Sequence, residues 1–406
     1  MSMRRLSSAA TACAVALSIV SAAGPTSAAV APKERADRTW MVDGKVFALA
    51  RHAGRLYIGG RFTQLQPPRG SGAAPMPAHN LAAIDLASGE PVRSWRPDVG
   101  GADATVHALA IEGGAVYVGG RFASLGGSPV ANLGAVTLAG GDAIGGFAPD
   151  VSGRVYALLA SPDRLYAGGA FGRVDGLSRA KLAAWNLPSR SLTQAWKPRA
   201  LGGAVRDLAF DAGHGAVFIA GAFDAMAQGG STFTRESVAK VDAATGSLSS
   251  WQIPVGQVGS PQTGWDVSAT ASRLHGGFGR GPNFAASFDA TGNVGTRIWR
   301  FGVVGNVQAV ELSPGGSRLY LGGHFGLGRL QQQICGKNLR GLISVDPATG
   351  APFCDWIPQL APFGGNFNGP WALEAVGQRL WVGGGWGKVD GLRQRNLARF
   401  TVPEAT

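Results

Sequence analysis

The chain has 406 residues, of which 63 are Gly, and it carries a formal net charge of +12 with 15% charged and 45% hydrophobic residues. This much glycine without a Gly-x-y period excludes collagen, and the hydrophobic content excludes a largely disordered chain. Ala, Val and Leu dominate the hydrophobic residues and long runs of Glu, Lys and Gln are missing, which argues against a helical protein. The composition is typical of many short strands joined by tight turns.

The N-terminal segment has the features of a secretory signal peptide. Arg4 and Arg5 precede a hydrophobic stretch from Ala9 to Ala23 that is too short to span a bilayer, and small residues surround Ala28. We expect residues 1–28 to be removed, residues 29–38 to form a short linker, residues 39–402 to fold as one domain and residues 403–406 to form a tail. The arginine pair leaves the twin-arginine route open beside the general one, and we expect a secreted protein without a membrane span.

Two cysteines, Cys335 and Cys354, remain after removal of the signal peptide. In an oxidising compartment an even pair favours a disulfide bond, which would contribute about 3 kcal/mol by closing a loop of this size. Two buried free thiols are the alternative.

A short phrase of strand residues, a pair of small residues and an aromatic residue recurs along the chain. Its copies are Arg55–Phe62, Ala115–Phe122, Arg164–Phe171, Ala216–Phe223, Arg273–Phe278, Arg318–Phe325 and Arg379–Trp386. Each copy follows a V-x-A-L phrase and precedes a variant of N-L-A-A-I-D, and a W-x-P phrase closes most repeats. Four short strands in a repeat of roughly fifty residues indicate a β-propeller blade.

We therefore predict an all-β fold, a seven-bladed β-propeller of four-stranded antiparallel blades. The last repeat ends after its third strand at Phe400, whereas Thr39 and Trp40 precede the first repeat. An N-terminal strand should then complete the last blade and close the ring, which leaves no edge strand unpaired.

The second position of the V-x-A-L phrase varies while its neighbours scarcely do. Because it lies near the start of each innermost strand, these side chains should surround the upper mouth of the channel. Aromatic rings with a few hydrogen-bonding groups suit a sugar or another small ligand, and packing between blades is the alternative. The ring comprises Phe47, His107, Tyr156, Arg206, Trp265, Gln308 and Trp371.

Positive charge gathers in the loops between the second and third strands, which also vary most in length. Loops that vary on one face usually mark the binding face, so this top face is a candidate for anions, and solvated charge that binds nothing is the alternative. The arginines are Arg69, Arg173, Arg179, Arg235, Arg280, Arg329, Arg393 and Arg395.

Signals for catalysis are weak. The histidines show no metal-ligand spacing, and the sequence contains no H-E-x-x-H, G-x-S-x-G or P-loop motif. Asp266 beside Trp265 is a candidate channel acid without a visible partner. We expect neither a metal nor a cofactor, although propellers assemble sites from single residues on separate blades.

The pattern G-G-x-F, V-D-G and L-A-A-x-D resembles the delta-sixty-repeat propellers of secreted bacterial proteins, and its diglycine resembles kelch propellers. Residues 168–186 and 383–400 show it best, and the resemblance covers residues 40–400. It implies a β-propeller and an extracellular location but no settled activity, so no catalytic residue follows from it.

The sequence favours an extracellular binding protein over an enzyme. Its expected partner is a cell-surface carbohydrate, an anionic polymer or another extracellular protein on the top face, rather than nucleic acid, and we expect a monomer. The alternative is a secreted hydrolase, lyase or quinoprotein-like oxidoreductase with its site at the channel mouth.

Overall fold

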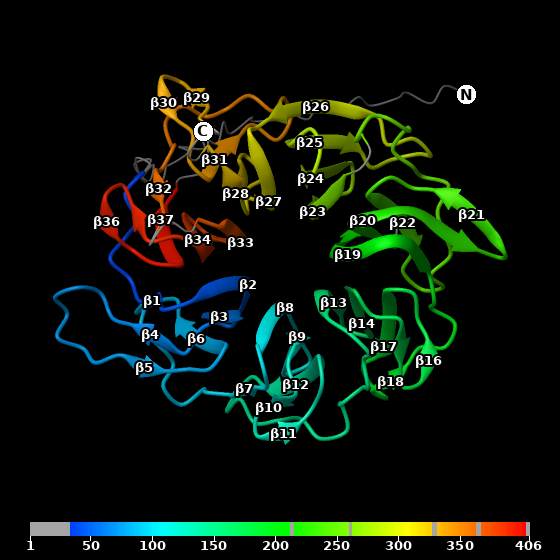
Figure 1. The fold of residues 1–406 in the computed structure, drawn as a ribbon, viewed down its shortest axis with the longest axis horizontal. Coiled ribbons are helices and arrows are strands. Elements are labelled where there is room, and N and C mark those ends of the chain that lie inside the picture. Colours follow the sequence, from blue (N-terminus) through cyan, green and yellow to red (C-terminus); the bar gives the residue numbers. More distant parts are fainter. Residues whose placement is uncertain (1–32, 212–214, 260–261, 327–330, 363–366, 403–406) are drawn as a thin grey trace, which may run out of the picture. The chain divides into compact units, whose positions relative to one another are not determined.

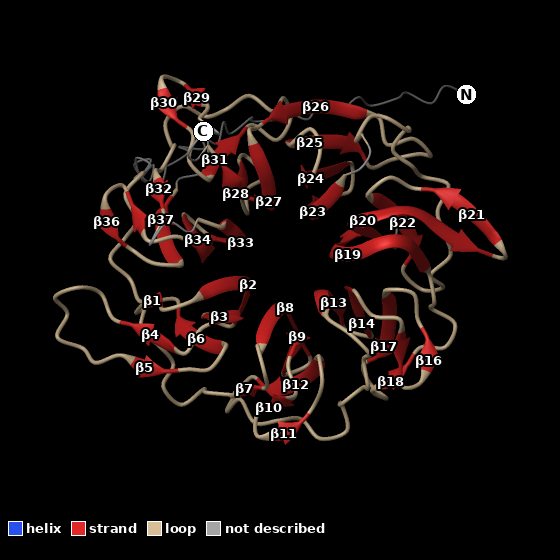
Figure 2. Cartoon of the chain, in the orientation of Figure 1, coloured by secondary structure: helices blue, strands red, loops and turns tan. Residues whose placement is uncertain are grey.

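The computed structural model describes residues 33–211, 215–259, 262–326, 331–362 and 367–402. By its internal contacts the chain divides into residues 1–30 and 31–406, and all described residues belong to the second unit. The predicted signal peptide, part of the predicted linker and the predicted tail lie outside the described residues. The described residues form strands, turns and loops without any α-helix (Figure 2), so none of their segments is a helix that could cross a membrane.

The strands form antiparallel sheets arranged around a central channel as a β-propeller (Figure 1). In each repeat an inner strand pairs with a middle strand, and the middle strand pairs with a third strand. The inner strands are β2 (Lys45–His52), β8 (Thr105–Glu112), β13 (Val155–Ser161), β19 (Arg199–Asp211), β23 (Thr263–Ala269), β27 (Gly305–Leu312) and β33 (Gly369–Val376). The middle strands are β3 (Arg55–Arg61), β9 (Ala115–Arg121), β14 (Arg164–Gly169), β20 (Ala216–Gln228), β24 (Arg273–Gly279), β28 (Leu319–Phe325) and β34 (Arg379–Gly385).

The third strands are β6 (Leu81–Asp85), β12 (Leu133–Thr137), β17 (Leu182–Asn186), β22 (Val238–Asp242), β25 (Phe284–Asp289), β31 (Leu342–Val345) and β37 (Leu397–Thr401). A fourth strand pairs with the third as β18 (Ser191–Leu192) and as β26 (Arg297–Gly302). Other repeats show only a single bridge at this place, such as Ile84 with Pro91. The fourth segment is therefore more irregular than the sequence pattern predicts.

Short strands also form in the segments that connect the inner, middle and third strands. They are β1 (Met41–Val42), β4 (Gln64–Gln66), β5 (Met76–Pro77), β7 (Val99–Gly100), β10 (Ser124–Leu125), β11 (Ser128–Pro129), β15 (Arg173–Val174), β16 (Leu177–Ser178), β21 (Ser231–Thr234), β29 (Gln333–Ile334), β30 (Lys337–Asn338), β32 (Leu360–Ala361), β35 (Lys388–Val389) and β36 (Leu392–Arg393). The pairs β1 with β4, β7 with β10 and β32 with β35 join the segment before an inner strand to the loop after the middle strand. These two kinds of connection thus share one face, which we call the top face.

The small-residue pair explains how adjacent sheets approach one another. A Cβ on Gly59, the first residue of its pair, would lie 2.5 Å from Cγ1 of Val106 on the next inner strand. A Cβ on Gly60, the second residue, would lie 2.1 Å from the carbonyl oxygen of Lys45. Both distances are too short for any side chain, so both positions require glycine.

One contact between sheets reverses this pattern. The fourth repeat has Ala220 where the others have the first glycine, and the next inner strand has Gly264 where most have Val. A Cβ on Gly264 would lie 3.2 Å from Cβ of Ala220, so the volume lost on one strand compensates for the volume gained on the other. In the following repeat Gly277, rather than Gly276, is the residue that receives the next valine, Val307.

Buried tryptophans join most of the sheets to the next, and Phe147 takes their place in the second repeat. The indole N–H of Trp95 donates to the carbonyl of Thr137, and that of Trp196 to the carbonyl of Asp242. The equivalent N–H of Trp356 donates to the carbonyl of Lys33 in the N-terminal segment. The tryptophans of the W-x-P phrase therefore stabilise the contacts between sheets with both buried area and a hydrogen bond.

The N-terminal segment lies alongside the last strand. The N–H of Lys33 donates to the carbonyl of Thr401 at 3.1 Å, and the N–H of Asp37 to the carbonyl of Arg399 at 2.8 Å. Arg399 also pairs with the Asp37 carboxylate. Residues 33–37 thus bind β37, although we expected a linker there, and β2 packs against β33 and β34 (Figure 1).

The two cysteines form the expected pair, since a disulfide bond joins Cys335 to Cys354 with Cα atoms 5.6 Å apart.

The glycine contact predicts a coupled effect on stability. Gly59→Ala should lower the free energy of unfolding by about 1–3 kcal/mol, because the new methyl group overlaps Val106. In a Val106→Ala background the same change should cost clearly less. Gly302→Ala is the control, because nothing lies within 4 Å of its new Cβ. Urea unfolding checks this, and an equal cost of Gly59→Ala in both backgrounds would contradict the assigned contact.

The N-terminal contacts predict that residues 33–42 stabilise the last sheet. A chain that begins at Asp43 lacks the buried Trp40 and the hydrogen bonds to β37. Relative to a chain that begins at Ala31, it should lose at least about 3 kcal/mol of unfolding free energy, as is common when a buried Trp is removed. Thermal and urea unfolding of the two chains measure this, and identical unfolding curves would rule the role out.

Candidate functional site

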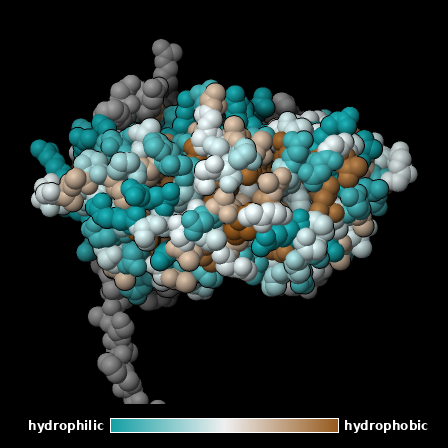
Figure 3. Space-filling view, turned by 90° about the horizontal axis from the view of Figure 1, so that it is seen from below, coloured by the Kyte–Doolittle hydropathy of each residue, from teal (hydrophilic) through white to brown (hydrophobic). Residues whose placement is uncertain are grey.

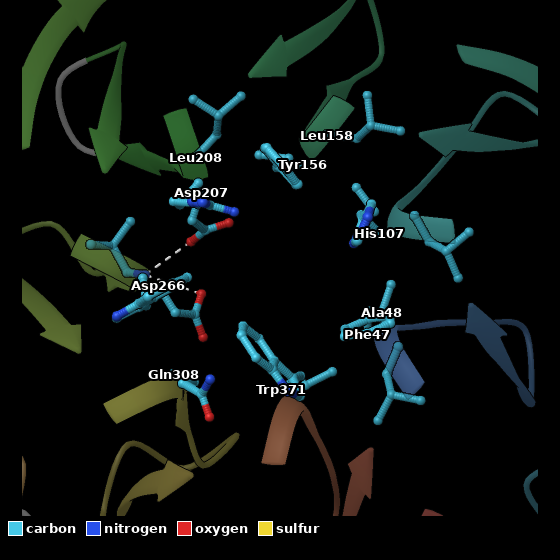
Figure 4. Close-up of a pocket in the computed structure, with 18 of the residues that line it drawn as sticks. Phe47, Ala48, His107, Tyr156, Leu158, Asp207, Leu208, Asp266, Gln308 and Trp371 are labelled. Atoms are coloured by element: carbon cyan, nitrogen blue, oxygen red, sulfur yellow. Dashed lines mark hydrogen bonds between the residues drawn. The ribbon is translucent and has the colours of Figure 1, made fainter. Parts of the chain in front are cut away.

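Each inner strand carries a β-bulge at the variable position of its V-x-A-L phrase. In β2, Val46 pairs with Gly60 and Ala48 pairs with Gly59, so Phe47 between them has no partner on β3. A bulge re-aims the extra side chain, and here it turns that side chain toward the channel (Figure 4). The same irregularity recurs at His107, Tyr156, Arg206, Trp265, Gln308 and Trp371.

All seven predicted ring residues line one cavity of about 610 Å³ in the channel. This volume lies within the range of small-ligand sites. The bulge explains why the position varies: it leaves the packing between sheets to the flanking Val and Ala.

Six of these side chains form a closed series of contacts, which we call the collar. Its members are Phe47, His107, Tyr156, Arg206, Trp265 and Trp371. Ring centroids are 5.1 Å apart for Phe47 and His107 and also for His107 and Tyr156. They are 5.6 Å apart for Trp265 and Trp371 and 5.7 Å apart for Trp371 and Phe47.

Arg206 closes the collar between two aromatic rings. Its guanidinium carbon lies 4.3 Å from the Tyr156 centroid and 5.0 Å from the Trp265 centroid. Both distances are within the range of cation–π attraction. Arg206 thus brings a fixed positive charge to a surface that is otherwise aromatic.

Four carboxyl groups, which we call the acid series, line the cavity on adjoining inner strands. Asp207 accepts the Val267 N–H at 2.9 Å, and Asp266 accepts the Val310 N–H at 2.7 Å. Glu311 accepts the Ala375 N–H at 3.2 Å, and Glu374 accepts from Nε of Arg51 at 2.8 Å. Each acid therefore reaches from its own strand to the next sheet around the channel.

The pKa values of all four carboxyl groups of the acid series are raised above their usual values. Burial raises the pKa of Asp266, and the neighbouring Asp207 raises it further. Burial first, and then the charge of Glu374, raise the pKa of Glu311 to about 8. Burial raises the pKa of Glu374 to about 7 although Arg51 lowers it. The side chain of Asp266 hydrogen-bonds to that of Asp207.

His107 differs because the same burial acts on a base. Burial first, and then the charges of Arg154 and Arg206, lower the pKa of His107 to about 4. His107 is therefore a neutral ring at physiological pH, able to stack and to accept or donate one hydrogen bond.

The mouth above Phe47 and His107 is basic. A hollow of about 550 Å³ is lined by these two rings and by four cations, Lys45, Arg61, Arg121 and Arg154. Asp103 lies 2.7 Å from Arg61 and 3.8 Å from Arg121. Lys45 and Arg154 are exposed and pair with no acid among the described residues. The mouth therefore carries a net positive charge.

The predicted loop arginines do not form one set. Arg69, Arg173, Arg280 and Arg393 are exposed, Arg395 is half-buried, and Arg329 lies outside the described residues. Arg179 and Arg235 are buried, and each donates to backbone carbonyls of its own repeat, Thr193 and Ser249 respectively. These two support the fold and are not available to an external anion, because their guanidinium groups already bind carbonyls.

The sequence interpretation missed most of the site's polar groups. Asp207 and Asp266 occupy the Ala position of the V-x-A-L phrase, which we treated as nearly invariant, and Glu311 and Glu374 follow that phrase directly. The sequence showed no partner for Asp266, and in the structure its partner is Asp207. Comparing the third position across repeats would have found the first two acids.

Within the described ranges, no group of three or more His, Cys, Asp or Glu residues is arranged to hold a metal ion.

Comparison with known proteins shows the fold alone. No protein-family model matches the chain, and no curated sequence does. The crystal structure of the WD40 β-propeller domain of Doa1 matches with a TM-score of 0.52 and 10% identity, covering 90% of this chain and 95% of that one. The computationally designed Ika8 protein gives a TM-score of 0.49 and 13% identity over 90% of this chain and all of that one. The chain is thus a β-propeller by structural likeness to the Doa1 domain.

The acid series predicts that stability falls as the pH rises. In the unfolded chain Glu311 loses its proton near pH 4.5, whereas in the folded protein it does so at about pH 8. The folded state therefore holds more protons in this window, and the unfolding free energy should decrease from pH 5 to pH 9. Glu311→Gln should reduce that decrease, because the amide still accepts the Ala375 N–H and cannot ionise.

Urea unfolding at pH 5, 7 and 9 checks this, with Glu236→Gln outside the channel as the control. A Glu311→Gln protein with the full pH dependence of the original would contradict the assignment.

Proposed function

We propose that this protein is an extracellular binding protein that recognises an anionic carbohydrate at the mouth of its channel. The observation that carries the proposal is the closed collar of aromatic rings and Arg206 beneath a mouth with four cations. Aromatic faces bind the C–H faces of sugar rings, and the cations attract carboxylate or sulfate groups.

The mouth supports this function better than the outer loops do. Lys45, Arg121 and Arg154 converge with Phe47 and His107 on one hollow. The face shown in Figure 3, by contrast, mixes many hydrophilic residues with smaller hydrophobic areas. The proposed site is therefore the mouth and the collar rather than the top loops.

The extracellular location rests on the signal-like N-terminal sequence and on the disulfide between Cys335 and Cys354, which suits an oxidising compartment. We also propose seven blades, closed where residues 33–37 bind β37, as in the delta-sixty-repeat pattern. The continuity of the glycine contact favours closure, because Gly383 of the last repeat receives Val46 of the first.

A secreted hydrolase or lyase is the second candidate. The observation that favours it is the hydrogen-bonded pair of Asp207 and Asp266, since two carboxyl groups that share a proton are able to exchange protons with a substrate or a water molecule. A binding protein returns its ligand intact, whereas an enzyme returns shorter chains, so mass spectrometry of the recovered ligand separates the two.

The basic mouth predicts a strong dependence of binding on salt. Affinity for an acidic polysaccharide should fall as salt rises, because its anionic groups release counterions on binding. Arg121→Gln with Arg154→Gln should weaken binding roughly tenfold at low salt and reduce the slope of log affinity against log salt by up to about 2. Titration calorimetry at several salt concentrations measures both effects.

The matched control is Arg69→Gln with Arg173→Gln, which removes the same charge from exposed top loops. If this pair weakens binding as much as the mouth pair, attraction is general and the mouth is not the site. If no acidic polysaccharide binds even at low salt, the proposed function is wrong.

A further inference from the structure

The cavity beneath the collar has two unlike walls. All seven inner strands contribute an apolar side chain from the end of the V-x-A-L phrase, such as Leu49, Leu109 and Leu158, and on β2, β8 and β13 no carboxyl group accompanies it. Strands β19, β23, β27 and β33 contribute the acid series and Gln308. Figure 4 shows side chains from both walls pointing into the channel. An apolar wall opposite a hydrogen-bonding wall complements a sugar ring, which has a C–H face and hydroxyl groups at its edge.

Three polar atoms at this wall lack partners. Gln308 is only 6% exposed, and its Oε1 has no hydrogen-bond partner among the described residues. The indole N–H groups of Trp265 and Trp371 are likewise unpartnered within that part of the chain. Buried polar atoms are normally hydrogen-bonded, and a ligand that enters the cavity lined by these three side chains is one source of the missing partners.

Charge divides the site along the channel. The four cations line the hollow of the mouth, and only Arg154 of these also lines the cavity, together with Arg206 and the acid series. A sugar ring with its own carboxylate would be attracted at the mouth, whereas the cavity disfavours a further negative charge, as the raised pKa values of Asp266, Glu311 and Glu374 indicate. The cavity therefore suits an uncharged ring, and the mouth suits a charged one.

Access to the cavity is along the channel axis, because its lining comes from every inner strand around it. A ring that reaches the cavity must then belong to the end of a chain. We propose that the cavity binds the uncharged terminal ring of an acidic oligosaccharide while the adjacent, charged ring lies among the cations of the mouth. This inference rests on the proposed function and adds which part of the polymer is recognised.

Alternating oligosaccharides with an odd number of rings give a direct test, because both of their ends carry the same sugar. One pentasaccharide has N-acetylglucosamine at both ends and two glucuronic acids; the other has glucuronic acid at both ends and three such acids. The proposal predicts that the first binds about 3- to 10-fold more tightly, as expected for one or two added hydrogen bonds. Electrostatic attraction alone predicts the reverse order, because the second carries more charge.

Two variants of the full chain locate this preference. Gln308→Leu keeps the side-chain volume and removes the unpartnered acceptor, so it should abolish most of the preference between the two pentasaccharides. Trp371→Phe keeps an aromatic ring, removes the indole N–H and gives a second reading should Gln308→Leu fail to fold. Arg121→Gln at the mouth is the matched control, which should weaken both pentasaccharides while leaving their ratio unchanged.

The outcomes separate the inference from the proposed function. If the long glucuronic acid–N-acetylglucosamine polymer binds but the two pentasaccharides bind equally, in the reverse order or not at all, end recognition is wrong and the mouth remains the site. A preference that survives both Gln308→Leu and Trp371→Phe also overturns the cavity's role. If the polymer itself does not bind at low salt, the proposed function and this inference both fail.

Discussion

The close approach of neighbouring inner strands is the constraint on which the structure depends. The first glycine of a pair receives the valine of the next inner strand, as Gly59 receives Val106, and the second glycine leaves room for the carbonyl of Lys45. That carbonyl belongs to the residue just before Val46, where the bulge at Phe47 begins. The packing between sheets and the direction of the channel side chains are therefore set within the same short segment.

Within the V-x-A-L phrase, different residues therefore serve the packing between sheets and the surface of the channel. The residues on either side of the bulge pair with the middle strand and pack against neighbouring sheets, so they are confined to a few small residue types. The bulged residue faces the channel, where aromatic rings, Arg206 and Gln308 are all accommodated. The same channel is polarised, with cations at the mouth and carboxyl groups beneath the collar, and this polarity gives a ligand one orientation in which it fits.

Much of this was accessible from the sequence because the repeats act as an internal comparison. The seven residues at the variable position, Phe47 and Trp371 among them, all line the cavity, together with residues that the pattern did not single out. The acid series was missed because Asp207 and Asp266 replace an alanine that was considered fixed. Arg179 and Arg235 were misread as free loop charges, because their burial depends on carbonyls that come from a later part of the repeat. Trp40 indicated how the N-terminus meets the last repeat, but the hydrogen bonds to β37 come from Lys33 and Asp37, which no motif marks.

The central claim is that the channel, and not an outer loop, is the place where a ligand binds. A crystal structure of the protein with the pentasaccharide that ends in N-acetylglucosamine tests this most directly. The account predicts electron density for a sugar ring within hydrogen-bond distance of Gln308 and in contact with the rings of Trp265 and Trp371, followed by a glucuronate near Arg154. Density beside Arg69 or Arg173, with an empty cavity, would contradict it.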